Sequence, residues 1–177
     1  MDKRQALAQN ALGFMYDKGE CVQKNGKTAA KWYLLAAEQE HESAKSNLGQ
    51  MHTNGVAGIQ NSVTAIKYVI CAAEQGHANA QFYLGDVYDK GKGVPIHDKE
   101  AAKWYTLAAE QGHMEAQFCL GDIYEKGKGV PINAPESAKW FTLAAEQGYA
   151  NAQSNLGNIY RRGEGVPQND TAAVKWY

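Results

Sequence analysis

The apolar side chains of residues 116–148 follow helical spacing twice. Ala116, Leu120 and Ile123 fall on one face of a first helix, and the next set does the same further on: Ala138, Phe141, Ala144 and Ala145. Between the two sets, the run Gly-Lys-Gly-Val-Pro at 127–131 interrupts the spacing. The pattern therefore predicts two amphipathic helices joined by a short turn.

This helix–turn–helix pattern recurs every 36 residues along the chain. A Leu-Gly pair stands at 12–13, 48–49, 84–85, 120–121 and 156–157. A lysine is followed by a large aromatic residue once in each period, at Trp32, Tyr68, Trp104, Trp140 and Trp176. A fixed period of this length is typical of solenoids, in which each repeat buries its apolar face against its neighbours.

We expect five repeats, at approximately 1–40, 41–76, 77–112, 113–148 and 149–177. No Pro/Gly/Ser-rich linker separates them, so the sequence predicts one continuous solenoid domain over 1–177. The last repeat stops within its second helix, which suggests that the chain is cut from something longer.

Glycine and polar residues predict how the helices pack and end. Gly121 lies mid-helix, where glycine costs about 1 kcal/mol against alanine, so its recurrence suggests close approach of another helix. Gly127 is expected to be the left-handed residue that ends the first helix. Asn133 is expected to cap the second helix, as are Asn61 and Asn169 in the same slot. Where that slot holds His97, the cap is expected to pass to the next residue, an aspartate.

Two motifs carry a resemblance to a known family. The run Ala-x-x-x-Leu-Gly-x-x-Tyr-x-x-Gly-x-Gly-Val, followed by Lys-Trp-Tyr/Phe-x-x-Ala-Ala-Glu-Gln, resembles the Sel-one-like repeat (SLR) along the whole chain. The 36-residue period and the Gly-x-Gly-Val loop favour it over the related 34-residue tetratricopeptide repeat. The resemblance implies an all-α fold, a right-handed α/α superhelical solenoid, and a role as adaptor or scaffold in protein complexes.

The same resemblance implies an alternative function. Some bacterial, cysteine-rich members are associated with penicillin binding or weak β-lactam hydrolysis, and regularly placed cysteines staple their helix pairs. Here Cys21, Cys71 and Cys119 stand at three different repeat positions, and we expect free thiols. Cys71 takes a leucine position and is expected in the core, whereas Cys119 is expected to be partly exposed and modifiable. No serine begins a Ser-x-x-Lys motif, so no catalytic residue is expected.

Composition narrows the classes of partner. The chain has 18 Lys+Arg and 19 Asp+Glu, a formal net charge of -1, and lacks the basic excess of a nucleic-acid binder. No apolar run approaches the roughly 18 residues of a membrane span, and no motif for a cofactor occurs. The first ten residues show no signal-peptide core. The compartment stays open: cytoplasmic, or periplasmic or secreted if a signal was removed.

Two recurring residue types could suggest a ligand site. His41, His77 and His113 recur at the starts of first helices, but packed helices lie about 8–10 Å apart while a zinc–nitrogen bond is about 2.1 Å. We therefore interpret them as a surface position of the repeat and expect no metal. The tryptophans open Ala-rich helical faces, and we interpret them as core.

The face of the first helices turned away from the core is the candidate binding surface. If it lines the concave side of the solenoid, it forms an acidic groove with two phenylalanines; otherwise it is a solvated polar face. We expect a protein or peptide partner that is basic beside an apolar anchor. The candidate residues are Asn79, Phe82, Asp86, Asp89, Glu115, Phe118, Asp122, Glu125, Asn158 and Arg161.

Overall fold

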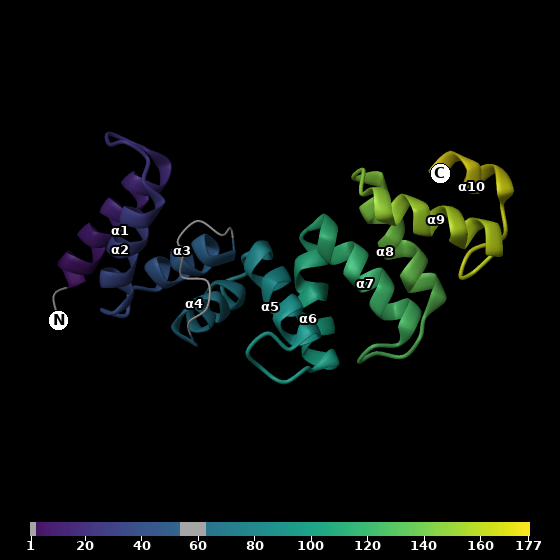
Figure 1. The fold of residues 1–177 in the computed structure, drawn as a ribbon, viewed down its shortest axis with the longest axis horizontal. Helices are drawn as coiled ribbons and strands as arrows, with labels where there is room; N and C mark the ends of the chain where they lie inside the picture. Colours follow the sequence, from purple (N-terminus) through teal and green to yellow (C-terminus); the bar gives the residue numbers. More distant parts are fainter. Residues whose placement is uncertain (1–2, 54–62) are drawn as a thin grey trace. The chain divides into compact units, whose positions relative to one another are not determined.

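The computed structural model describes residues 3–53 and 63–177, in which all the regular secondary structure is helical. The chain falls into two compact units, 1–83 and 84–177 (Figure 1). The helices of the described residues confirm the predicted alternation of first and second helices. In chain order they are α1 (Lys3–Lys18), α2 (Gly26–Ala37), α3 (Glu42–Thr53), α4 (Val63–Glu74), α5 (Ala78–Lys90), α6 (Asp98–Glu110), α7 (Met114–Lys126), α8 (Ala134–Glu146), α9 (Ala150–Arg162) and α10 (Asp170–Trp176).

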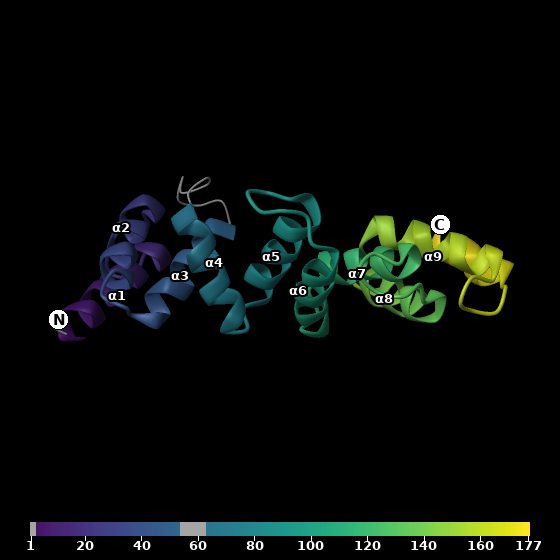
Figure 2. The same ribbon diagram turned by 90° about the horizontal axis from the view of Figure 1, so that it is seen from below.

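Consecutive helices pack side by side within each unit. In the first unit α1 packs on α2, α2 on α3 and α3 on α4. In the second unit the same succession runs from α6 to α10 (Figures 1 and 2). The C-terminal half of α5 belongs to the second unit. This pairing of neighbours is the α/α repeat architecture that the 36-residue period predicted.

Small residues and a few large ones build the core. The leucine of each Leu-Gly pair is buried in the described repeats two to five, at 1%, 1%, 1% and 0% exposure for Leu48, Leu84, Leu120 and Leu156. In the second unit Leu156 joins alanines of α8 and α9 around Phe141. Alanines such as Ala144, which is fully buried, let the helices approach closely enough to exclude water.

The glycine after that leucine makes room for an aromatic ring. A Cβ atom on Gly121 would lie 2.8 Å from the ring of Phe141, and one on Gly85 would lie 2.7 Å from the ring of Tyr105. Both rings are buried. The expected close approach is therefore confirmed, but in these two repeats the approaching group is a side chain of the second helix.

Repeat two shows why the ring matters. Val69 stands at the position that holds the ring in the other repeats. The atom closest to a Cβ on Gly49 is instead the backbone carbonyl oxygen of Tyr68. A Cβ on that glycine would clash with the Tyr68 carbonyl oxygen. The smaller side chain thus lets the second helix itself come close, as the sequence argument had supposed for all repeats.

In repeat four the Gly-x-Gly loop contacts the repeat before it. Gly127 is left-handed, at φ 69°, and its N–H donates to Ile123 O over 2.9 Å, as predicted for the end of α7. Gly129 is also left-handed, at φ 71°, and a Cβ there would lie 2.5 Å from the carbonyl carbon of Asp98. The second glycine is therefore required because the loop rests on the start of α6 in the preceding repeat.

The predicted caps are confirmed at two positions and wrong at one. Asn133 Oδ1 accepts from the N–H of Glu136 at 3.2 Å, and Asn169 Oδ1 accepts from Ala172 at 2.9 Å. Asn61 lies outside the described residues. At the third slot, His97 caps α6 itself, because its Nδ1 accepts from Glu100 N at 3.2 Å. A neutral imidazole nitrogen is geometrically equivalent to the asparagine oxygen here.

Leu120→Ala tests the core. Leu120 is 1% exposed, so the lost burial and the cavity should lower the free energy of unfolding by about 2–5 kcal/mol. Because neighbouring repeats stabilise one another, the loss should extend to the repeats on either side. Thermal unfolding monitored by circular dichroism checks this, and a melting temperature equal to that of the parent would contradict the assignment.

Gly121→Ala tests the contact between glycine and ring. Alanine favours a helix by about 1 kcal/mol, but the clash with Phe141 should reverse the sign and cost about 1–3 kcal/mol. Adding Phe141→Leu should recover part of that loss, although Phe141→Leu alone destabilises. The comparison requires four melting curves, and a stabilising Gly121→Ala would show that the ring is not a constraint.

Candidate functional site

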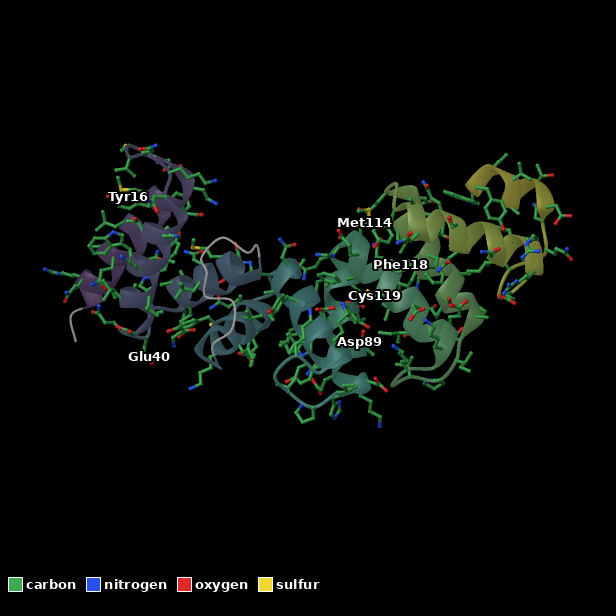
Figure 3. The ribbon with its side chains drawn as sticks, viewed as in Figure 1. Tyr16, Glu40, Asp89, Met114, Phe118 and Cys119 are labelled. Carbon is green, nitrogen blue, oxygen red and sulfur yellow. The ribbon has the colours of Figure 1, made fainter. Side chains whose placement is uncertain are left out.

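A hollow of about 180 Å³ opens between α5, α6 and α7 in the second unit. We call it the second-unit hollow. Figure 3 shows Asp89, Phe118 and Cys119 in this region. The residues that line it are Asp89, Tyr105, Phe118, Cys119, Asp122, Ile123 and Lys128.

Three candidate residues line this hollow: Asp89, Phe118 and Asp122. The other candidates lie around it or apart from it. Asp86 is on α5 and Glu125 is exposed near the end of α7; Glu115 is in the first turn of α7. Asn158 and Arg161 are on α9, with the guanidinium of Arg161 donating to Asn158 Oδ1 over 3.4 Å. Asn79 is exposed and Phe82 half-buried; both belong to the first unit, so the pairing of Phe82 with Phe118 stays a prediction.

The helical spacing predicted that Phe118 points away from the core, but its ring also contacts core residues. Its ring centroid lies 5.6 Å from that of Phe141 and 5.0 Å from that of Tyr149. Both contacts are tilted, a favourable arrangement for aromatic pairs. The ring is half-buried because Tyr149, just before α9, covers one side of it. Phe118 therefore contributes to stability as well as to the lining of the hollow.

Lysines neutralise much of the predicted acidic surface. Asp86 pairs with Lys90 and Lys92, and Asp122 pairs with Lys126. Asp89 Oδ1 lies 3.4 Å from the Nζ of a loop lysine, Lys128. Sequence reasoning missed the loop lysines, although the middle position of Gly-Lys-Gly-Val was a visible signal.

Burial and ion pairing compete at Asp86. Its side chain is only 13% exposed, and burial opposes the ionised form. Hydrogen bonds and charge from Lys90 and Lys92 outweigh burial and lower the pKa of the Asp86 carboxyl below its ordinary value. Asp86 therefore stays ionised and fixes a lysine of α5 and a lysine of the loop, a structural role that its candidate status had not anticipated.

The thiols of this protein are free, and burial disfavours the thiolate of the one at the hollow. All three cysteines are unpaired, which confirms the sequence expectation. Burial raises the pKa of the Cys119 thiol to about 11, so the nucleophilic thiolate is scarce at neutral pH and modification is disfavoured. Cys71 was expected in the core and is half-exposed instead, with its Sγ 3.5 Å from Glu42 Oε2. The same repeat position is exposed at Leu35 as well.

Two of the three recurring histidines cap helices. The Nδ1 atoms of His41 and His113 each accept the N–H three residues on, at 3.3 Å. The side chain of His113 is only 12% exposed, so the predicted surface position is wrong for it. Within residues 3–53 and 63–177 no cluster of three or more His, Cys, Asp or Glu could hold a metal.

The core interpretation of the tryptophans is confirmed for Trp104 and Trp140, whereas Trp32 and Trp176 are half-buried.

Comparison with known proteins identifies the repeat. A model of the Sel1 repeat family matches residues 6–41, 43–77, 78–113, 115–149 and 150–177. The chain belongs to the Sel1 repeat family. The five matches agree in number with the predicted repeats. No curated protein sequence matches the chain.

Solved structures support this assignment. A Sel1 repeat protein from Oxalobacter formigenes is 37% identical, with a TM-score of 0.78 over 99% of this chain and 70% of that one. A protective antigen of uropathogenic Escherichia coli with an SLR fold is 35% identical, with a TM-score of 0.79 over 97% of this chain and 37% of that one. Helicobacter pylori cysteine rich protein B is 26% identical, with a TM-score of 0.55 over 71% and 93% of the two chains.

Membership of the family fixes the general role. Sel1 repeat proteins are generally scaffolds for protein–protein interaction, and their fold is typically non-catalytic. The free cysteines of this chain give no support to the stapled, β-lactam-binding alternative. No helix among the described residues is both long and apolar enough to cross a bilayer.

The capping role of His113 makes stability depend on pH. Burial lowers the pKa of its imidazole, although the nearby Glu115 carboxylate opposes this, so the folded state prefers the neutral ring. The unfolded chain then binds more protons below about pH 6.5, and stability should fall as the pH drops below that value. Asparagine keeps a capping acceptor but does not titrate. We expect His113→Asn to melt near the parent at pH 8 and to lose less stability at pH 5.5; an unchanged pH profile would contradict the capping role.

Proposed function

We propose that the second unit binds a segment of a protein partner across α5, α6 and α7, at the second-unit hollow. An apolar side chain of the partner packs against Phe118, and a neighbouring basic side chain reaches the carboxylates of Asp89 and Asp122. The single observation that supports this is the hollow itself, which places a half-buried aromatic ring beside two carboxylates. Aromatic residues of this kind typically dominate the binding energy of an interface.

The lysines already paired to these carboxylates decide which basic residue fits. The side chains of Lys126 and Lys128 are 55% and 43% exposed, so each can turn into solvent at little cost. An arginine of the partner can bind a carboxylate through two parallel hydrogen bonds, which a lysine cannot. We therefore expect arginine to be preferred over lysine at this site.

The mixture of charges also limits how strongly the surface attracts a partner. Four lysines surround the five candidate carboxylates of this unit, which are Asp86, Asp89, Glu115, Asp122 and Glu125. Long-range attraction is correspondingly modest, and the contacts at short range carry the specificity. Raising the salt concentration should weaken the ionic part while the contact with Phe118 persists.

A methyl NMR titration tests the site directly. Met114 lies one helical turn before Phe118 on α7 and packs against the same core, so its methyl group reports on the hollow. A peptide acetyl-Leu-Arg-Arg-Leu-amide should shift the Met114 signal, and its Lys-Lys counterpart should bind more weakly. Asp122→Asn should weaken the arginine peptide by at least about threefold, because it removes one charge-assisted contact.

The control variant is Glu146→Gln, which removes an exposed carboxylate near the end of α8, away from the hollow. It should leave binding unchanged. Phe118→Ala is unsuitable as the main test because its ring also packs against Phe141. Equal affinity of the Asp122→Asn and Glu146→Gln variants for the arginine peptide would contradict the proposed site.

A further inference from the structure

The first unit contains a hollow of its own, of about 350 Å³, between α1, α2 and α3. We call it the first-unit hollow. It lies on the side of α1 that faces the following repeat. Its lining residues are Phe14, Asp17, Lys18, Lys24, Tyr33, Asn47, Gln50 and Met51.

The two hollows occupy the same place in the repeat. Five lining residues of the first precede five of the second by two periods of 36 residues. Asp17, Tyr33, Asn47, Gln50 and Met51 correspond in this way to Asp89, Tyr105, Cys119, Asp122 and Ile123. In both units a buried tyrosine of the second helix, which also packs against the mid-helix glycine, lines the hollow. The backbone architecture is therefore shared, and the remaining side chains set the chemistry.

An exposed phenylalanine distinguishes the first-unit hollow. Phe14 is 42% exposed, whereas its equivalents in the other repeats are polar residues: Gln50, Asp86, Asp122 and Asn158. Leu7 lies two helical turns earlier on the same face of α1, outside the lining of this hollow, and is 60% exposed. Its equivalents are polar as well: Ser43, Asn79, Glu115 and Asn151. Repeat one thus has apolar side chains at two positions where the other four repeats of this chain have polar ones.

The charge of this hollow is opposite to that of the second. Lys18 Nζ lies 3.0 Å from Asp17 Oδ2 and 5.8 Å from the ring centroid of Phe14, so one lysine is balanced. Lys24 has no ion pair among the described residues, and it leaves the lining with an excess positive charge. Asn47 Nδ2 donates to Asn10 Oδ1 over 3.3 Å and holds the polar wall in place.

We propose that the first-unit hollow binds an acidic segment of a protein partner that carries an apolar side chain next to its carboxylates. The apolar side chain packs against Phe14, and a carboxylate pairs with Lys24. Charge complementarity selects this occupant, because a basic segment would bring like charges together at Lys24. The site is separate from the second-unit hollow, so it stands if that proposal fails.

Met51 provides the measurement, because it lines the hollow and is one of only four methionines in the chain. The probe is acetyl-Leu-Glu-Glu-Phe-amide, titrated into protein labelled at methionine methyl groups with ¹³C. The Met51 signal should shift with the acidic peptide and stay in place with the Lys-Lys counterpart. The Met114 signal, in the second unit, should not respond to the acidic peptide.

Two variants and one control decide the result. Lys24→Glu should weaken the acidic peptide by at least about fivefold and allow the Lys-Lys peptide to bind. Phe14→Ala should weaken the acidic peptide by a similar factor with little change in melting temperature, because the ring is already 42% exposed. Lys27→Glu, an exposed residue of α2 outside the lining, is the matched control and should have no effect.

Three outcomes would overturn the proposal. One is equal binding of both peptides, and another is equal affinity of the Lys24→Glu and Lys27→Glu variants for the acidic peptide. The third is a Met51 shift that follows protein concentration without any peptide, which would make a second copy of the chain the occupant. The site is supported if Met51 responds to the acidic peptide in the parent and in Lys27→Glu, and if Lys24→Glu loses this response. A loss in Phe14→Ala as well also supports the site.

Discussion

The contact between a mid-helix glycine and an aromatic ring is the constraint on which the helix pairs of repeats one, three, four and five depend. A side chain on Gly121 would occupy the position of the Phe141 ring, and one on Gly85 that of the Tyr105 ring. Glycine weakens the helix that carries it by about 1 kcal/mol, and the buried ring offsets this through the large apolar area it removes from water. The recurrence of glycine therefore has a steric cause: the ring from the second helix packs against the glycine of the first helix.

The same contact connects the core to the two hollows. Tyr105 packs on Gly85 from one side and lines the second-unit hollow on the other, and Tyr33 does the same beside Gly13. Core packing thus sets the position of each hollow, while the other side chains that line it can differ from repeat to repeat. This separation suits a scaffold, because side chains such as Phe14 or Lys128 can change the preferred partner without altering the helix pair beneath them.

The backbone repeats while the side chains around each hollow vary, and this explains why the two hollows differ in charge. In the second unit, loop lysines reach back to Asp86 and Asp89 and leave a mixed surface. In the first, Lys24 remains unmatched among the described residues beside an exposed ring. Electrostatic complementarity contributes more to selecting a partner than to overall affinity. If both proposed sites bind, two hollows of opposite charge in one chain would distinguish two chemically different segments.

The sequence by itself determined the all-helical architecture, the period, the buried leucines and the caps at Asn133 and Asn169. These follow from local spacing and backbone geometry, which repeat five times and so reinforce one another. Only the tertiary structure decided matters that depend on neighbours outside the helix concerned. Phe118 is half-buried because Tyr149 from the next repeat covers it, and Asp86 is occupied because Lys92 reaches it from a loop. A helical count places a side chain on a face, but which groups of other elements meet it there depends on how those elements pack.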